Sequence, residues 1–170
     1  VYPMAERWAR DSGLRLLDLC AAINGADGYE TVDLHGADVV TDLNERWPFD
    51  DGTVGVIRAH DALEHLRDPQ HVMREAYRVL ADKGWFLTQT PSTDGRGAFQ
   101  DPTHVSFWNS NSFWYYTRQS QNRFIDCPVR FQANRIVDFF PTEFHETHNI
   151  IYTRADLVKI AGRMPGGVLI

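Results

Sequence analysis

Residues 42–92 decide the fold of this chain, and they read DLNERWPFDDGTVGVIRAHDALEHLRDPQHVMREAYRVLADKGWFLTQTPS. Within this stretch, residues 47–53 combine a proline, two aspartates and a glycine, which are residue types typical of turns. The apolar run Val54–Ala59 follows the turn directly and predicts a buried strand.

A helix and a second strand complete the same stretch. In the range Pro69–Leu80 the apolar residues recur at steps of three and four, which predicts an amphipathic helix. Asp68 suits the N-cap because its carboxylate can accept backbone N–H groups, and a proline is favourable at the first helical position. Asp82-Lys83-Gly84 is predicted to close the helix, and residues 85–90 then alternate as a strand does.

Outside this stretch the pattern predicts more strands and one more helix. Short apolar runs indicate strands at Leu14–Cys20, Tyr29–Leu34, Ala37–Thr41, Phe131–Phe139 and Asn149–Tyr152. The helical linkers between the first three strands look short or missing, and Arg154–Ala161 is expected to form a final short helix. Strands that alternate with helices predict a largely parallel sheet covered on both faces, with ligands beyond the carboxyl ends of its strands.

The composition indicates a single domain over residues 1–170. Hydrophobic residues make up 43% of the chain, enough for one core, and the net charge of −6 argues against a protein that mainly grips nucleic acid. Cys20 and Cys127 lie far apart without CxxC spacing, so neither a disulfide framework nor a thiolate zinc site is predicted. Because no apolar run approaches the ~20 residues of a membrane span, we expect a cytoplasmic protein without a membrane partner.

A carboxylate follows each of three predicted strands, at Asp33, Asp42 and Asp61. An acid just past a strand can accept hydrogen bonds from a ribose diol or an adenine amino group. Taken singly, Asp33 and Asp42 are better explained as residues that cap turns. Taken together, the three favour a nucleoside-binding site.

The stretch that opened this section carries a family resemblance. It combines the acidic Asp42 with Pro48-Phe49, Leu63-Glu64-His65, Arg78-Val79-Leu80 and the turn at Gly84. In this order the pieces resemble a class I S-adenosylmethionine-dependent methyltransferase of the small-molecule type. The resemblance implies an α/β fold of Rossmann-like type, with a doubly wound, mostly parallel sheet and helices on both faces. It also implies S-adenosyl-L-methionine as cofactor and a small molecule as methyl acceptor.

The resemblance further implies roles for individual residues around the cofactor. Asp33 would hold the ribose hydroxyls, and Asp42 together with the backbone at Leu43 would meet adenine. Ala59 and His60, at the end of the fourth strand, would lie beside the methionine part of the cofactor.

The first loop departs from the family pattern. Members usually carry Gly-x-Gly after the first strand, because the missing side chains let the backbone approach the cofactor. Cys20 and Ala22 occupy these positions, and both residue types resist positive φ. Gly55 stands where the family usually has aspartate. These departures motivate an alternative, a methyltransferase-like binding or regulatory domain with impaired catalysis.

Residues 92–122 form a long segment rich in glycine, serine, asparagine and aromatic residues, and we expect an aromatic loop there. It is predicted to bind the acceptor through Arg96, Asp101, Trp108, Asn109 and Tyr115. His104 is the candidate catalytic base, although a histidine after Asp-Pro-Thr can equally hold its own loop in place. The exposed aromatic residues could also serve a homodimer interface.

A metal-dependent hydrolase is the remaining enzyme alternative. It is motivated by three groups of possible ligands: His60-Asp61, Glu64-His65 and His145-Glu146-His148. The sequence contains no HExxH motif, however, and a Glu-His pair at a helix start is explained by capping and packing. We therefore assign His65 a structural role and predict no metal site.

Overall fold

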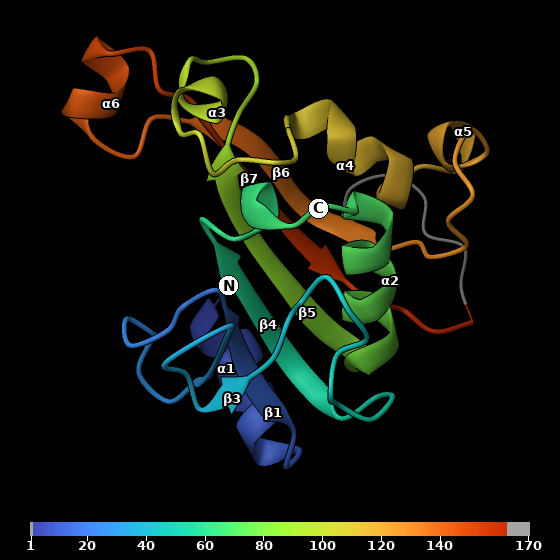
Figure 1. The fold of residues 1–170 in the computed structure, drawn as a ribbon. Helices are drawn as coiled ribbons and strands as arrows, with labels where there is room; N and C mark the ends of the chain where they lie inside the picture. The colour runs from blue at the N-terminus through green and yellow to red at the C-terminus, as the bar shows by residue number, and fades with distance from the viewer. Residues whose placement is uncertain (1, 163–170) are drawn as a thin grey trace.

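A seven-stranded sheet forms the centre of the computed structural model, which describes residues 2–162 (Figure 1). Its strand order is β3-β2-β1-β4-β5-β7-β6. The strands are β1 (Arg15–Leu19), β2 (Glu30–Asp33), β3 (Val39–Val40), β4 (Val54–His60), β5 (Leu80–Pro91), β6 (Gln132–Phe139) and β7 (Tyr152–Val158). The pairs from β3 to β5 are parallel, and β7 runs antiparallel to both β5 and β6. The predicted mostly parallel sheet is confirmed.

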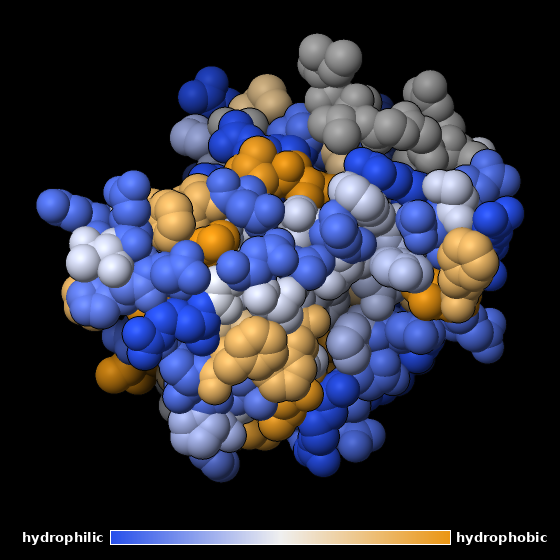
Figure 2. All heavy atoms as spheres, turned by 90° about the horizontal axis from the view of Figure 1, so that it is seen from above, coloured by the Kyte–Doolittle hydropathy of each residue, from blue (hydrophilic) through white to orange (hydrophobic). Residues whose placement is uncertain are grey.

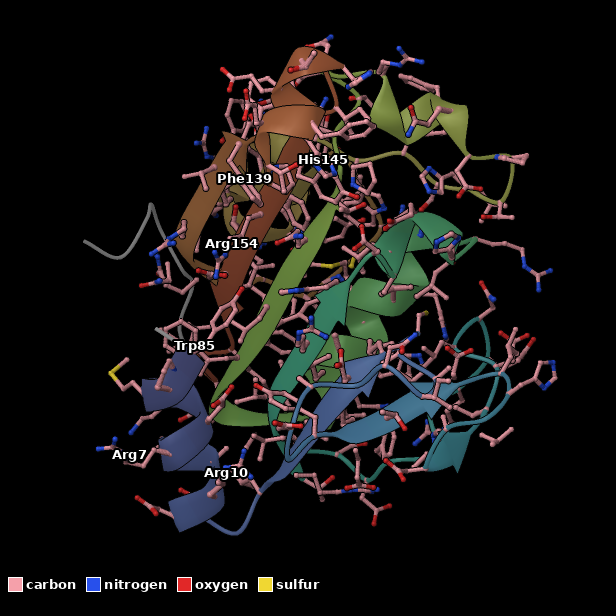
Figure 3. All side chains as sticks on the ribbon, turned by 90° about the vertical axis from the view of Figure 1, so that its left-hand side faces the viewer. Arg7, Arg10, Trp85, Phe139, His145 and Arg154 are labelled. Carbon is pink, nitrogen blue, oxygen red and sulfur yellow. The ribbon has the colours of Figure 1, made fainter. Side chains whose placement is uncertain are left out.

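Helices cover both faces of the sheet, as expected. They are α1 (Tyr2–Asp11), α2 (Pro69–Val79), α3 (Gly97–Gln100), α4 (Ser110–Thr117), α5 (Gln119–Asn122) and α6 (Glu143–Thr147), with a 3₁₀ turn at Leu63–His65. The apolar faces of α2 and α4 bury the main core on one side, and α1 packs against β1, β4 and β5 on the other side (Figure 3). None of the described helices is long and apolar enough to cross a membrane.

The N-terminus of α2 follows the prediction closely. The Asp68 carboxylate accepts the backbone N–H groups of Gln70 at 2.9 Å and His71 at 3.1 Å, and Pro69 occupies the first helical position. The cap satisfies two donors that a helix start otherwise leaves without partners. The helix ends at Val79, and β5 begins at once with Leu80, slightly earlier than predicted.

The connections from β1 to β2 and from β2 to β3 contain no helix, as the sequence suggested. Parallel strands are usually joined by a helical crossover. Here residues 20–29 instead fold back over the sheet, where the buried Asp18 carboxylate accepts the Ala26 N–H at 2.8 Å and an Arg58 N–H at 2.5 Å. On this face α1 contacts β1, β4 and β5.

Gly55 allows α1 to approach the sheet. A Cβ atom at this position would lie 2.4 Å from the Cβ of Ala9, which is fully buried in α1. A side chain at position 55 would therefore push the helix off β4. This close approach gives a structural reason for glycine where the family usually has aspartate.

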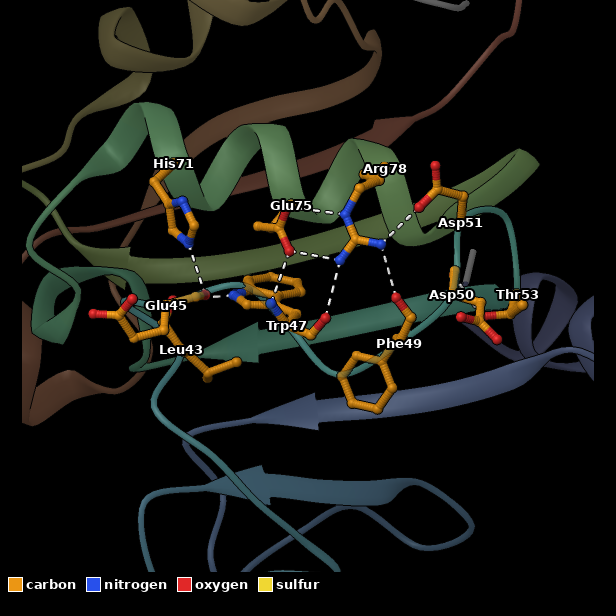
Figure 4. Close-up of polar contacts among 10 residues, drawn as sticks. All are labelled: Leu43, Glu45, Trp47, Phe49, Asp50, Asp51, Thr53, His71, Glu75 and Arg78. Carbon is orange, nitrogen blue, oxygen red and sulfur yellow. Dashed lines mark hydrogen bonds and ion pairs between the residues drawn. The ribbon is translucent and has the colours of Figure 1, made fainter.

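A cluster of polar contacts ties α2 to the loop before β4 (Figure 4). Arg78 donates to both oxygens of Glu75 at 2.9 and 2.6 Å, to the carbonyl oxygens of Trp47 at 3.0 Å and Phe49 at 2.7 Å, and to Asp51 at 2.7 Å. Glu75 also accepts the Trp47 backbone N–H at 2.8 Å. The arginine of the Arg-Val-Leu motif and the Pro-Phe-Asp turn thus belong to one arrangement.

Two sequence predictions need correction. Residues 92–122 are not one loop, because they contain α3, α4 and α5, and α4 starts with a capping box between Asn109 and Ser112. Arg154–Ala161 is not a helix, because Tyr152–Val158 forms β7 between two antiparallel partners. Thr153, Ala155 and Leu157 are buried, with the charged Arg154 and Asp156 between them, so this segment alternates as a strand does and the helix prediction missed that pattern.

Candidate functional site

A cleft of about 270 Å³ opens beyond the carboxyl ends of β1 and β2 and beside β4. Figure 2 views the molecule from above and shows hydrophilic residues interspersed with several hydrophobic patches on that face. The walls of the cleft include four residues predicted to bind the cofactor, Cys20, Asp33, Asp42 and Leu43. Further lining residues, absent from the predicted set, are Leu34, Thr41, Asn44, Asp61, His65 and Leu66.

Asp33 presents an acceptor to this cleft. One carboxylate oxygen accepts the backbone N–H of the next residue, Leu34, at 2.6 Å. Within residues 2–162, the second oxygen has no hydrogen-bond partner from another residue. A single free carboxylate oxygen at a strand end is suited to the hydroxyl groups of a ribose.

Asp42 is held firmly in the opposite wall. Its Oδ1 accepts both the backbone N–H and the side-chain N–H of Asn44 at 2.8 Å, and these hydrogen bonds lower the pKa of Asp42. The neighbouring Leu43 is buried, and its carbonyl oxygen accepts the indole N–H of Trp47 at 3.0 Å. The contacts of Figure 4 hold Trp47, so they also fix this wall of the cleft.

The loop after β1 has the backbone conformation that favours glycine, although Cys20 and Ala22 stand at the positions where the family usually has glycine. The φ angles are +56° at Cys20 and +41° at Ala22, in the left-handed region that L-residues rarely adopt. The Cys20 N–H also bonds the Val32 carbonyl at 2.8 Å. Burial raises the pKa of the Cys20 thiol to about 12, so the thiol stays protonated at neutral pH. Ala22 lies outside the cleft, in a separate hollow with Ile23.

The strand-end residues of β4 are divided between the two faces of the sheet. Ala59 is fully buried in the main core. His60 points towards α1, with Nε2 3.5 Å from the Tyr2 hydroxyl, and burial lowers its pKa to about 3. The placement of His60 beside the cofactor is therefore corrected, because the alternation along the strand turns it away. Asp61, with φ +50°, faces the cleft instead.

A second cleft of about 240 Å³ adjoins the first, and Asp61 and His65 line both. Glu64, Asp101 and His104 also line it. The Glu64 side chain is 1% exposed, and burial raises its pKa. Its Oε2 accepts the Thr90 hydroxyl at 2.8 Å, whereas Oε1 has no partner.

A family model for a methyltransferase domain matches residues 7–157. The chain belongs to this methyltransferase family. The resemblance found in the sequence to a class I S-adenosylmethionine-dependent methyltransferase domain is confirmed. No curated protein sequence matches this chain.

Solved structures with similar folds agree with this assignment. The [4+2]-cyclase SpnF is 14% identical, with a TM-score of 0.61 over 97% of this chain and 81% of that chain. An S-adenosylmethionine-dependent methyltransferase from Mesorhizobium loti is 12% identical, with a TM-score of 0.60 over 93% and 97%. Geranyl diphosphate C-methyltransferase from Streptomyces coelicolor A3(2) is 15% identical, with a TM-score of 0.55 over 94% and 76%. At these identities the likeness shows the fold.

The predicted acceptor residues of this methyltransferase domain do not meet at one place. Asp101 lines the second cleft with His104. Trp108 is buried and stacks on Phe113, so it belongs to the core. Asn109 caps α4, and its amide donates to Thr93 at 2.8 Å.

The two other predicted acceptor residues also lie apart from the second cleft. Tyr115 shares a separate hollow near Pro69 with Trp108, and Arg96 lines none of the described clefts. The local composition predicted a polar and aromatic segment that binds the acceptor. The helices α3, α4 and α5 in this segment orient these side chains in different directions. The homodimer through this segment stays a prediction.

The ligand set of the hydrolase alternative is dispersed. His145 bonds the Thr142 hydroxyl at 2.7 Å, and His148 bonds the Phe144 carbonyl at 2.8 Å, both around α6. His60 lies towards α1, 3.5 Å from the Tyr2 hydroxyl, and Arg154 is close enough to help lower its pKa. Asp61, Glu64 and His65 of this set line the second cleft, whereas His60, His145 and His148 do not.

Proposed function

We propose that this methyltransferase domain binds S-adenosylmethionine in the first cleft and transfers its methyl group to a small-molecule acceptor. The observation that carries the proposal is the meeting of Asp33, Asp42 and the positive-φ loop at Cys20 around one cleft at the carboxyl ends of the strands. Nucleosides bind at this place in open α/β sheets. The residues present therefore fit the cofactor.

Each wall has a distinct task in this proposal. The free oxygen of Asp33 accepts the ribose hydroxyls, and the wall at Asp42 and Leu43 meets adenine. The backbone at Cys20 approaches the amino-acid end. The bound cofactor supplies an electrophilic methyl group, and the acceptor must be held in line with it. We place the acceptor where the two clefts join, at Asp61 and His65.

His104 remains the predicted base. Its Nδ1 lies 3.0 Å from the Ala98 carbonyl oxygen, which can only accept, so Nδ1 donates and the neutral ring keeps a lone pair on Nε2. This lone pair can take a proton from an acceptor hydroxyl or amine. A loss of turnover on replacing His104 by Gln, with unchanged cofactor affinity, would support the role. Equal turnover would exclude it.

Calorimetric titration with S-adenosylmethionine and S-adenosylhomocysteine tests cofactor binding. Asp33→Asn should weaken binding roughly tenfold to a hundredfold, because a hydrogen bond to a charged group contributes about 1.5–3 kcal/mol. Asp27→Asn is the matched control, since this exposed carboxylate lies outside the cleft. Wild-type protein that gives no heat contradicts the proposal. Equal affinities of both variants and wild type show that Asp33 does not hold the ribose.

A binding or regulatory domain with impaired catalysis is the second candidate. Cys20 and Ala22 in strained backbone favour it, and the similar fold of a [4+2]-cyclase shows that this architecture also serves another reaction. The two candidates differ in the release of S-adenosylhomocysteine during incubation with a panel of small acceptors. Tight binding of the cofactor without release would select the second candidate.

A further inference from the structure

We propose that Glu64, His65 and His104 bind a divalent transition-metal ion in the second cleft. Each residue offers one donor atom, and the three donor atoms lie within 4.8 Å of one another. Two imidazoles and a carboxylate are a ligand set that zinc and iron commonly use. The binding of the ion stands on these contacts alone, and its role in methyl transfer rests on the proposed function.

The buried carboxylate of Glu64 is the first observation. Oε1 has no hydrogen-bond partner, and no lysine or arginine of residues 2–162 forms an ion pair with this carboxylate. A buried charge without a partner is costly, so the site favours a cation. The Glu64 carbonyl oxygen also accepts the backbone N–H groups of Val105 at 2.8 Å and Ser106 at 3.1 Å. These bonds hold the segment that follows His104 against Glu64.

The hydrogen bonds of the two histidines are the second observation. His104 Nδ1 lies 3.0 Å from the Ala98 carbonyl oxygen. His65 Nδ1 lies 3.3 Å from both the Thr103 carbonyl oxygen and the Thr103 hydroxyl, whose own proton is donated to Asp101 Oδ1. A carbonyl oxygen can only accept, so each Nδ1 carries the proton and each Nε2 keeps its lone pair. Metal-binding histidines are usually oriented by such a bond on the other ring nitrogen. The ring centroids lie 5.1 Å apart, in an edge-to-face arrangement.

The cleft provides room for the ion and a further ligand. Bonds of about 2.0–2.2 Å place donor atoms roughly 3–4 Å apart around one ion, so small rotations of the two rings close the site. Asp101 Oδ2 lies 4.0 Å from His104 Nε2, and Asp101 Oδ1 is held by Thr103. Asp101 thus lies at the edge of the site beside His104, outside the group of three donors. A remaining position faces the cleft, where an acceptor oxygen can bind.

The ion gives His104 a role different from that of a base. A metal-bound hydroxyl loses its proton more readily than a free hydroxyl. An acceptor hydroxyl bound to the ion would give its proton to water, and its oxygen would take the methyl group as S-adenosylhomocysteine leaves. The Nε2 lone pair of His104 would then bind the ion instead of a proton. The position fits this task because Asp61 and His65 border both the second cleft and the cofactor cleft.

Metal titration of untagged, chelator-treated protein without S-adenosylmethionine tests the inference. Calorimetry with Zn²⁺ should show one ion per chain, and the melting temperature should rise with added Zn²⁺. Glu64→Gln and His104→Gln should each weaken binding at least about tenfold and suppress the rise. His148→Gln, which removes an exposed histidine of α6, is the matched control and should behave as wild type.

The outcomes separate the possible explanations. Metal-free Glu64→Gln should melt no lower than metal-free wild type, because the amide removes a buried charge, so a lost response to Zn²⁺ is not unfolding. If that variant does not fold, His104→Gln decides. Wild-type affinity in both variants, or binding lost in His148→Gln, overturns the inference. The cofactor titration is to be run with a chelator present, and the metal titration is run without cofactor. Failure of one proposal therefore leaves the test of the other unaffected.

Discussion

Replacement of Arg78 by Ala is expected to destabilise the fold and loosen one wall of the cofactor cleft. The guanidinium makes five hydrogen bonds, and its side chain is 15% exposed. Without it, the Glu75 carboxylate, which is 10% exposed, loses its ion pair and keeps only the hydrogen bond from the Trp47 N–H. The carbonyl oxygens of Trp47 and Phe49 also lose their donor. Breaking a buried ion pair costs about 3–5 kcal/mol. Because Asp51 is mostly exposed and adds little, we expect about 3 kcal/mol.

Arg78→Lys separates the charge from the geometry. Lysine keeps the positive charge but presents its donors from a single nitrogen, so it cannot reach Glu75 and both carbonyl oxygens together. We expect a loss of roughly half the alanine value, about 1.5 kcal/mol. Arg74→Ala is the control on the same helix, since Arg74 lies 3.6 Å from the exposed Asp68, and it should cost under about 1 kcal/mol.

Urea unfolding gives the free energies, and hydrogen exchange reports on the wall of the cleft. The amides of residues 43–50 should exchange faster in Arg78→Ala, and affinity for S-adenosylmethionine should fall with them. A cost below about 1 kcal/mol for Arg78→Ala, or wild-type stability of Arg78→Lys, would refute the reasoning that the fork of donors holds this loop.

Three further changes test other parts of the structure. Ala22→Gly should raise the free energy of unfolding by about 0.5 kcal/mol. Glycine relieves about 1–2 kcal/mol of strain from the positive φ angle, which exceeds the cost of its greater freedom in the unfolded chain. A lower free energy of unfolding in urea would contradict this. Gly55→Ala should cost about 1–3 kcal/mol by displacing α1, and a neutral result would show that the helix adapts freely. His60 has a pKa near 3 in the fold against 6.5 when unfolded, so its contribution is present above pH 6.5 and is lost as the pH falls towards 3. At pH 5 the loss is about 2 kcal/mol, and His60→Asn should flatten this part of the pH profile; an unchanged profile would assign the acid sensitivity elsewhere.

Local signals predicted much of the fold correctly. The cap at Asp68, the helix after it and the strand Val54–Ala59 depend on neighbouring residues, and all three are present in the structure. The prediction failed at Arg154–Ala161 because the alternation of Arg154 and Asp156 with Ala155 and Leu157 is short and was overlooked, although β7 pairs with two antiparallel strands. It failed at residues 92–122 because the short helices there are stabilised by packing against the core rather than by a periodic pattern.

The sequence by itself determined that this chain forms a mostly parallel α/β sheet of the methyltransferase type with carboxylates at the strand ends, because strand-end positions follow from local pattern. Only the tertiary structure decided which of these side chains share a cleft. His60 and Asp61 are neighbours in sequence, yet they face different sides of the sheet. Glu64 and His104 are distant in sequence, yet they border one cleft. The direction in which a strand-end side chain points, and the packing of the segment around His104 against Glu64, both depend on contacts between residues far apart in sequence. No local stretch of sequence contains this information.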